Sequence, residues 1–308
     1  MGWWHNLWEI KPFNAGYLPE KDGHQVFYME MGNPKGKPVL MFHGGPGGHC
    51  STHYAKAFNL KKYRVIGFDQ RGCGKSLPQG EIKNNSSKDL LDDATRLLDY
   101  LKINEKVILR GGSWGSTLAL LWAEKYPQRV DKLLLSQLFL ANKNDRSWDE
   151  KEAGLFYPEF EYFMRKKAHN QSLATYYAEL INSDNPDKQL EAINTYGQWE
   201  MVRNQLQPQW GSATTVDEEV LHELRIYINY AARNFDLGEN DIIDNIDKIT
   251  HIPTIIVHNR LDFSCPIKGA YDLYRAMQNA KLIIVPERGH FGKKLSKVRD
   301  KSFAEFIK

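Results

Sequence analysis

The sequence is poor in cysteine and has no long apolar run, and these shortages exclude several classes of protein. Its three cysteines, Cys50, Cys73 and Cys265, are odd in number and form no C-x-x-C pair. We therefore expect no disulfide framework and a reducing, cytoplasmic compartment. No apolar run approaches the roughly 20 residues that a membrane-spanning helix needs, so we expect no membrane partner.

The chain also lacks an excess of charge of either sign. Its 41 basic and 38 acidic residues give a formal net charge of +3, which is too small to indicate a nucleic-acid partner. The first residues, MGWWHNLWEIKPF, have no basic segment followed by an apolar core, so we expect no signal peptide. Asn6 stands where a myristoylation signal requires serine or threonine.

Short apolar runs that alternate with helical patterns are the main feature that is present. From the second run onward they are continuously apolar, as strands buried on both faces must be. Residues 87–102 place leucine and alanine at three- and four-residue spacing, which predicts an amphipathic helix. The alternation predicts an α/β fold with a doubly wound, mostly parallel sheet. The runs span residues 25–31, 38–44, 63–69, 106–111, 131–140, 253–259 and 280–286.

The alternation stops between about residues 141 and 252. This stretch is rich in Trp, Tyr, Glu, Asn and Lys and contains helical patterns such as residues 217–234, without a convincing buried strand. A chain of 308 residues is long enough for one large α/β domain with an inserted piece, or for two ordinary domains. We expect residues 1–140 and 253–308 to form the sheet domain and residues 141–252 to be a helical cap inserted into it.

A serine stands between glycines where the fourth apolar run ends. Residues 111–115 read GGSWG and match G-x-S-x-G, a strand-to-helix turn that lifts a nucleophilic serine clear of the sheet. Glycines suit this turn because strand and helix approach so closely that side chains would clash. A helical pattern follows and ends near Pro127. Ser113 is therefore a candidate nucleophile, although the motif alone also fits a simple tight turn.

A serine nucleophile needs a histidine base and a carboxylate that orients the histidine. For this type of turn the chain order is serine, then Asp or Glu, then His. Asp262 and His290 follow the last two apolar runs, and the carboxyl ends of parallel strands meet at one edge of a sheet. We predict Ser113, Asp262 and His290 as the catalytic residues.

The tetrahedral intermediate of such a reaction needs two backbone N–H donors. Residues 43–48, HGGPGG, follow the second run, where Gly45 would supply one donor. The other would be Trp114, directly after the nucleophile. The alternative interpretation of residues 43–48 is an ordinary Gly-Pro turn. His43 is expected to brace this loop, and His258 to be an ordinary hydrogen-bonded side chain.

Two further patterns receive no assignment. His49, Cys50 and His53 could bind a metal, but no fourth donor is near them in the sequence. Residues 72–76, GCGKS, resemble the end of a phosphate-binding loop, yet Asp69 stands where its first glycine should be. We therefore expect no metal and no cofactor, and we expect the Asp69 carboxylate to hold the turn that follows it.

Taken together, six motifs resemble those of the proline iminopeptidases, or prolyl aminopeptidases, of the α/β-hydrolase fold. The match runs from about residue 12 to the C-terminus, and the combination is far more specific than any of its parts. The resemblance implies a serine peptidase with a helical cap that removes an N-terminal residue, typically proline, from small peptides. Its catalytic residues carry over as Ser113, Asp262 and His290. The motifs are HGGPGG (43–48), DQRGCGKS (69–76), GGSWGSTLAL (111–120), QWE (198–200), NRLDFSCP (259–266) and ERGH (287–290).

The resemblance also implies substrate-binding residues. In the motif formed by Trp199 and Glu200, the glutamate grips the amino terminus of the substrate. Phe139 matches an aromatic residue that lines the proline pocket. A small peptide is thus the expected partner, while the oligomeric state is left open.

Three positions depart from the family pattern. Tyr227 stands where a second amine-binding glutamate is expected, Ala231 where an aromatic pocket residue is expected, and Asp149 where a tyrosine is usual. Either Asp149 or Glu223 supplies the missing charge, or the substrate is different. Glu223 lies four residues before Tyr227, on the same helix face.

Two other functions remain open at this point. The first is an esterase, amidase or lactonase that uses the same catalytic residues on small acyl substrates. The altered cap favours it, because the cap selects the substrate while the sheet keeps the chemistry. The second is a binding protein without activity, against which the complete set of serine, aspartate and histidine argues.

Overall fold

The computed structural model describes residues 10–169, 171–206 and 213–308. The expectations about a signal peptide and about Asn6 fall mainly on residues 1–9, which lie outside the described residues. Within the described ranges, no helix combines the length and the apolar character needed to cross a membrane.

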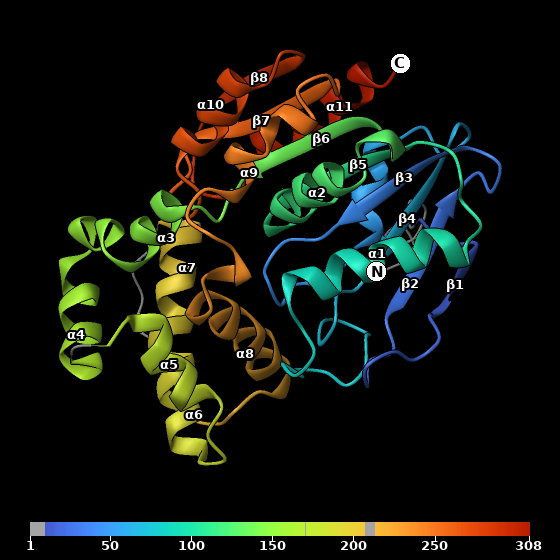
Figure 1. Ribbon diagram of the computed structural model, residues 1–308. Coiled ribbons are helices and arrows are strands. Elements are labelled where there is room, and N and C mark those ends of the chain that lie inside the picture. Colours follow the sequence, from blue (N-terminus) through green and yellow to red (C-terminus); the bar gives the residue numbers. More distant parts are fainter. Residues whose placement is uncertain (1–9, 170, 207–212) are drawn as a thin grey trace, which may run out of the picture.

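Eight strands form one sheet in the order β1-β2-β4-β3-β5-β6-β7-β8 (Figure 1). The two pairings made by β2 are antiparallel and all others are parallel, which confirms the mostly parallel sheet. Each of the seven predicted runs is a strand. The prediction missed β1, because this strand is short, mostly exposed and not apolar. The strands are β1 Asn14–Tyr17, β2 Phe27–Gly32, β3 Lys37–Phe42, β4 Tyr63–Phe68, β5 Val107–Ser113, β6 Val130–Leu138, β7 Thr254–Leu261 and β8 Ala280–Arg288.

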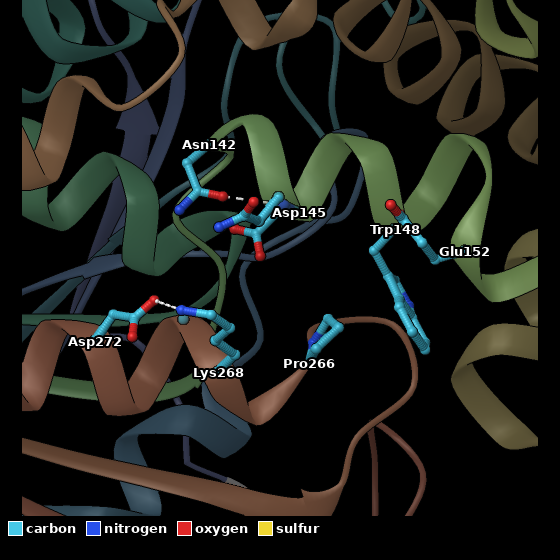
Figure 2. Close-up of a pocket in the computed structure, with 9 residues that line it drawn as sticks. Asn142, Asp145, Trp148, Glu152, Pro266, Lys268 and Asp272 are labelled. Carbon is cyan, nitrogen blue, oxygen red and sulfur yellow. Dashed lines mark hydrogen bonds and ion pairs between the residues drawn. The ribbon is translucent and has the colours of Figure 1, made fainter.

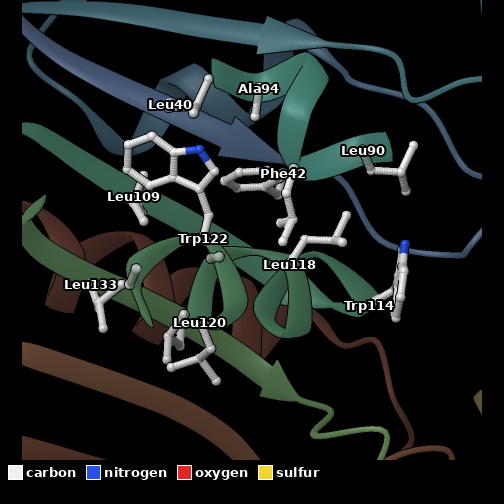
Figure 3. Packing of buried hydrophobic residues seen from close by; sticks show 14 of the residues in the cluster. Leu40, Phe42, Leu90, Ala94, Leu109, Trp114, Leu118, Leu120, Trp122 and Leu133 are labelled. Atoms are coloured by element: carbon white, nitrogen blue, oxygen red, sulfur yellow. The ribbon is translucent and has the colours of Figure 1, made fainter. Parts of the chain in front are cut away.

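Helices cover both faces of the sheet. Along β3, Leu40 and Phe42 join the core under one face, whereas Val39 and Met41 join the core under the other, as alternation in a strand requires. The first core includes Trp122, which lies between these strands and the neighbouring helices in Figure 3. It is covered by α1 Ser87–Tyr100, α2 Trp114–Lys125, α9 Asp241–Asp244 and α10 Ile267–Ala276, and the second core by α11 Lys293–Phe306.

The predicted helix over residues 87–102 is α1, which begins at Ser87 because Ser86 caps it. The Ser86 hydroxyl accepts the Asp89 backbone N–H, and the Asp89 carboxylate accepts the Ser86 N–H in return. This reciprocal pair satisfies two donors that would otherwise lack partners at the helix start.

Between β6 and β7 the described residues form helices and no strand. These helices share a separate hydrophobic core, and Figure 1 shows them gathered on one side of the sheet. A π-helical turn over Ile193–Gly197 joins α6 directly to α7, and such turns often occur at functional sites. The helices are α3 Lys143–Glu150, α4 Pro158–Ala168, α5 Leu173–Ile181, α6 Pro186–Ala192, α7 Gln198–Gln205 and α8 Glu218–Ala232.

Candidate active site

Ser113 is the last residue of β5 and directly precedes α2. Its backbone has φ 53° and ψ −130°, a conformation that non-glycine residues rarely adopt and that is typical of strained functional turns. A Cβ on Gly111 would overlap the Gly115 carbonyl oxygen, and one on Gly115 would overlap that of Phe42. The close approach predicted from the sequence therefore explains both glycines.

Asp262 and His290 meet at the carboxyl ends of β7 and β8. His290 Nδ1 lies 2.8 Å from Asp262 Oδ2 and 3.0 Å from Oδ1, and both side chains are buried. Asp262 Oδ1 also accepts the backbone N–H groups of Ser264 at 3.1 Å and Cys265 at 2.9 Å. The carboxylate is thus fixed on one side by its own loop, and it holds the Nδ1–H tautomer that leaves Nε2 free to act as a base.

Opposing effects act on the pKa of His290. Burial of the imidazole lowers the pKa, but the adjacent Asp262 carboxylate raises it by charge and by hydrogen bonding, and Glu200 adds to this. The net result is a pKa above the ordinary histidine value. The arrangement therefore favours the imidazolium form that a histidine base acquires during catalysis.

The Ser113 hydroxyl makes no hydrogen bond with His290 in this structure, although both residues are described. Its contact is with the Cys265 thiol, where Oγ and Sγ lie 3.9 Å apart. Catalytic hydrogen bonds are often long or unformed without substrate, so the missing bond between Ser113 and His290 is compatible with a catalytic role for both residues. Burial raises the pKa of the Cys265 thiol well above its usual range, so the thiol stays neutral and is a poor nucleophile.

His258 has the ordinary role that we expected. Its Nδ1 accepts the Leu138 N–H at 2.9 Å, so Nε2 is protonated and donates to the Cys265 carbonyl at 2.8 Å. Burial lowers the pKa of His258, which keeps the ring neutral although Asp262 is 3.7 Å away.

The loop after β3 is braced by His43, as predicted. His43 Nε2 accepts the Gln70 N–H at 3.0 Å, and Nδ1 donates to the Gly44 carbonyl at 2.8 Å. The Gln70 side chain in turn accepts from the Trp114 indole at 3.0 Å. These bonds tie the loop that contains Gly45, with φ 120°, to the first residue of α2, whose N–H is among the unpaired donors of a helix start.

The turn after β4 also follows the prediction. The Asp69 carboxylate accepts the backbone N–H groups of Cys50 at 2.7 Å and Lys75 at 2.8 Å. It therefore holds two loops together at this edge of the sheet. Over the part of the chain that the structure describes, no group of three His, Cys, Asp or Glu side chains could hold a metal ion.

Ser113 lines a narrow pocket between the sheet and the helical segment. Among the predicted substrate-binding residues, Glu200, Phe139, Tyr227 and Asp149 line the same pocket. The pocket is lined by Gly45, Ser113, Phe139, Asp149, Glu200, Arg203, Asn204, Tyr227, Phe235, Ser264 and Cys265.

The structure does not bring two of the predicted residues to this pocket. Trp199 is buried in the core of the helical segment, against Phe160 and beneath the Arg203 guanidinium, because it faces away from the sheet on α7. Glu223 is exposed on α8, where its backbone carbonyl packs against Gly47. Ala231, the third departure from the family pattern, packs partly buried against the sheet core.

Arg203 is the main pocket residue that the sequence analysis missed. Its guanidinium is buried and donates from Nη2 to the Glu200 carboxylate and to the Tyr227 hydroxyl, the latter at 3.0 Å. Nη1 lies 2.7 Å from Asp149 Oδ1. Two departures from the family pattern, Asp149 and Tyr227, are thus contacts of one arginine. Its position three residues after Glu200, on the same helix face, was the available signal.

The charges of this cluster are linked. Burial raises the pKa of Asp149 to about 6, against the opposing effect of Arg203, and the nearby Glu200 carboxylate raises it further. The two carboxylates hold the pKa of the Arg203 guanidinium well above its usual range despite burial. With both acids ionised, the cluster has one net negative charge.

Two other missed residues shape the pocket. Asn204 follows Arg203 and donates from Nδ2 to Glu200 Oε1 at 3.0 Å. Phe235 packs against Phe139 and Trp114, with ring centroids 5.1 and 5.5 Å apart, and so forms an apolar wall near Ser113. A lone polar or aromatic residue in a helical stretch has no sequence signal that sets it apart.

A second hollow lies between α3 and α10 (Figure 2). Several of its polar groups already have partners: the Asp145 backbone N–H donates to Asn142 Oδ1 at 2.9 Å, and Lys268 pairs with Asp272. Burial raises the pKa of Asp145 to about 6, and its carboxylate accepts the Leu140 N–H. Ser113 does not line this hollow but does line the narrower pocket, which is therefore the candidate site of the chemistry.

Comparisons with known proteins identify the family of this chain. The model of the α/β hydrolase fold family matches residues 37–295. A proline iminopeptidase of Arabidopsis thaliana is 36% identical over 91% of this chain and 76% of its own length. One of Neisseria gonorrhoeae is 35% identical over 92% of this chain and 93% of its own length.

Solved structures show the same fold at low identity. VinJ has a TM-score of 0.65 at 16% identity and covers 96% of this chain and 99% of its own. The esterase EaEST of Exiguobacterium antarcticum has a TM-score of 0.60 at 19% identity and covers 96% and 100%. From the family model and the curated relatives together, the chain belongs to the α/β-hydrolase family and, within it, to the proline iminopeptidases.

Proposed function

We propose that this protein is a serine exopeptidase that releases an N-terminal residue, preferentially proline, from small peptides. The observation that supports this most strongly is that Ser113 and the Glu200 carboxylate line one pocket, beside the hydrogen-bonded pair of Asp262 and His290. A carboxylate at that place can bind the free amine of a substrate whose first carbonyl lies at Ser113. The names of the curated relatives point to the same activity.

The proposed reaction has two acyl-transfer steps. Ser113 Oγ attacks the carbonyl carbon of the first residue while His290 Nε2 takes its proton, and Asp262 holds the imidazolium. The N–H groups of Gly45 and Trp114 stabilise the oxyanion. His290 then returns the proton to the leaving amine as the C–N bond breaks. A water molecule then gives a proton to the same ring and attacks the acyl carbon. The ring returns this proton to Ser113 Oγ as the C–O bond to the serine breaks, which releases the amino acid.

The helical segment acts in this proposal as the cap that selects the substrate. Residues 1–140 and 253–308 form the catalytic domain, and residues 141–252 form the cap. Phe139 and Phe235 give one wall of the pocket an apolar surface that suits a pyrrolidine ring. The single net negative charge of the Glu200, Asp149 and Arg203 cluster matches one substrate ammonium group.

A second candidate function is an esterase or amidase for uncharged acyl substrates. It is favoured by the contacts of Glu200, whose carboxylate is already engaged by Arg203 and Asn204. A substrate amine must share this carboxylate with both groups, whereas an uncharged substrate would not depend on it.

A panel of chromogenic substrates separates the two functions. We expect hydrolysis of prolyl p-nitroanilide to exceed that of alanyl p-nitroanilide, and both to exceed that of the N-acetylated prolyl compound. A charge-assisted hydrogen bond to the amine is worth about 1.5–3 kcal/mol, so Glu200→Gln should lower kcat/KM for free prolyl p-nitroanilide about 10- to 150-fold.

The control for this experiment is Glu219→Gln, an identical change at an exposed position of α8. It should leave both substrates unaffected. Equal losses on free and acetylated substrates in Glu200→Gln would contradict the exopeptidase and favour the esterase or amidase.

We also propose a cytoplasmic location. All three cysteines are free and buried, which suits a reducing compartment. Recovery of the native protein in a periplasmic or secreted fraction of its source cells would contradict this proposal.

A further inference from the structure

Asn204 contacts three parts of the candidate active site at once. Its side-chain Nδ2 donates to Glu200 Oε1 at 3.0 Å, and its Oδ1 accepts from Ser264 Oγ at 2.6 Å. Its backbone carbonyl accepts the His290 N–H at 3.0 Å. One residue of the helical segment therefore bonds the amine-binding carboxylate and both loops that hold the catalytic Asp262 and His290.

The position of Asn204 in the chain explains why it can do this. α7 ends at Gln205, so the carbonyl of Asn204 is among the last four of the helix and has no partner within it. The His290 N–H satisfies this carbonyl. Gly289 favours this close approach, because a Cβ there would lie 3.2 Å from the Asn204 oxygen, which is a tight contact.

The second contact reaches Asp262 through Ser264. The Ser264 hydroxyl is held by Asn204, and the Ser264 backbone N–H donates to Asp262 Oδ1 at 3.1 Å. The loop that fixes the carboxylate is thus attached to α7 by one short hydrogen bond. Asn204 is partly buried, so this bond is shielded from competing water.

We propose that Asn204 is a positioning residue that couples the binding of a substrate amine at Glu200 to the placement of Asp262 and His290. The proposal rests on the proposed function, because it assumes that Glu200 receives the amine. When an amine binds, the Glu200 carboxylate moves toward it, and Asn204 moves with the carboxylate because its Nδ2 donates to Glu200 Oε1. The two loops that Asn204 holds are then fixed in the position in which His290 serves Ser113.

The proposal predicts a loss that appears mainly in kcat. In Asn204→Ala both side-chain bonds disappear while the backbone carbonyl remains, so the fold should persist. We expect kcat for prolyl p-nitroanilide to fall about 10- to 100-fold, the usual consequence of a small misplacement of catalytic groups. An uncharged ester should lose less, because its hydrolysis uses the loops but not Glu200.

The pH dependence gives a readout that a loss of stability alone would not change. The charged and titratable groups that face His290 are Asp262, Glu200, Arg203 and His258. The Asp262 carboxylate raises the pKa of His290. Asn204→Ala should loosen Asp262 and so lower this pKa, which moves the acid limb of kcat to lower pH. Asn204→Asp keeps an acceptor for Ser264 and adds a negative charge between Glu200 and the loop that holds Asp262. The added charge should raise the pKa of His290, so the acid limb of this variant should move to higher pH.

Two further variants complete the experiment. Ser264→Ala removes the same bond from the loop side and leaves α7 intact, so it tests the proposal even if Asn204→Ala fails to fold. Gln205→Ala, at an exposed position of the same helix, is the matched control and should behave like the wild type. The double variant Asn204→Ala/Ser264→Ala should be no slower than the slower single variant.

The coupling would be supported if the acid limb moves in opposite directions in Asn204→Ala and Asn204→Asp. It would also require that Asn204→Ala lowers kcat more for the aminoacyl substrate than for the ester. Unchanged kcat and unchanged pH profiles in Asn204→Ala and Ser264→Ala would overturn it. A change confined to KM for the aminoacyl substrate would also overturn it, because Asn204 would then serve Glu200 alone. Equal decreases of kcat for the aminoacyl substrate and the ester would overturn it as well. A wild type that cleaves only the ester would instead refute the proposed function, and the ester profiles would still report on His290.

Discussion

Replacing the buried Arg203 should destabilise the protein in a way that depends on pH. Arg203→Met keeps the length of the side chain but removes the cation from Asp149, Glu200 and Tyr227. Without this cation the Asp149 carboxyl can avoid an uncompensated charge by taking up a proton. Its pKa is already raised to about 6, so at pH 7 the protonation costs about 1.4 kcal/mol, which is the largest contribution that Asp149 can make to the loss of stability. The lost bonds to Glu200 and Tyr227 add about 1 kcal/mol each. We expect a total loss near 3 kcal/mol at pH 7.

The sign of the pH dependence follows from the raised pKa. A carboxyl whose pKa is higher in the folded than in the unfolded state destabilises the fold when it is ionised. This destabilisation is absent at low pH, where the carboxyl is protonated in both states, and grows as the pH rises above about 4. Removing Arg203 raises the pKa of Asp149 further. Near pH 5 the carboxyl is mostly protonated in both proteins and adds little to their difference. At pH 8 the same carboxyl adds about 2.7 kcal/mol, the equivalent of two pH units above a pKa of about 6.

Urea unfolding of the wild type and Arg203→Met at pH 5 and pH 8 measures this difference. The double variant Arg203→Met/Asp149→Leu is the control, because it leaves no uncompensated carboxylate at position 149 and should lose the pH dependence. An equal loss at both pH values would refute the reasoning, as would a double variant that keeps the full pH dependence.

Three further outcomes can be checked with simple assays. The acid limb of kcat/KM for prolyl p-nitroanilide should have its midpoint above the ordinary histidine value, since the pKa of His290 is raised and only the neutral ring accepts the Ser113 proton; a flat profile between about pH 5 and 8 would exclude a histidine base. Gly115→Ala should lower the free energy of unfolding by about 1–3 kcal/mol or more, because its Cβ would lie 2.8 Å from the His43 carbonyl oxygen and closer still to that of Phe42. Gly269→Ala, inside α10 with its nearest neighbour at 3.6 Å, should instead raise stability by up to about 1 kcal/mol, and thermal unfolding distinguishes the two signs.

The sheet could be predicted because its signals are local. Seven apolar runs, six of them continuously apolar, correspond to seven strands. The strand-to-helix turn around Ser113 followed from glycines at positions where the structure leaves no room for a side chain. β1 could not be found this way, since four mostly exposed residues that pair only with β2 show no apolar pattern.

The pocket was harder to predict because its residues come from distant segments. Glu200 was found through its motif, but the pairing of Arg203 with Asp149 joins positions 54 residues apart and depends on how α3 packs against α7. The same holds for Asn204, whose partners Ser264 and His290 lie on other elements. Trp199 shows the opposite error: it adjoins Glu200 in the sequence but points to the other side of the helix, into the core.

The most direct test of the central claim is to identify the acylated residue. The wild type and Ser113→Ala are incubated with a fluorophosphonate that labels activated serines, digested and analysed by mass spectrometry, and prolyl p-nitroanilide hydrolysis is followed in parallel. We predict one label per chain on Ser113, loss of activity in proportion to labelling, and in Ser113→Ala no label and a turnover about four to six orders of magnitude lower. Labelling of another residue, or prolyl p-nitroanilide hydrolysis that survives in Ser113→Ala, would contradict the account.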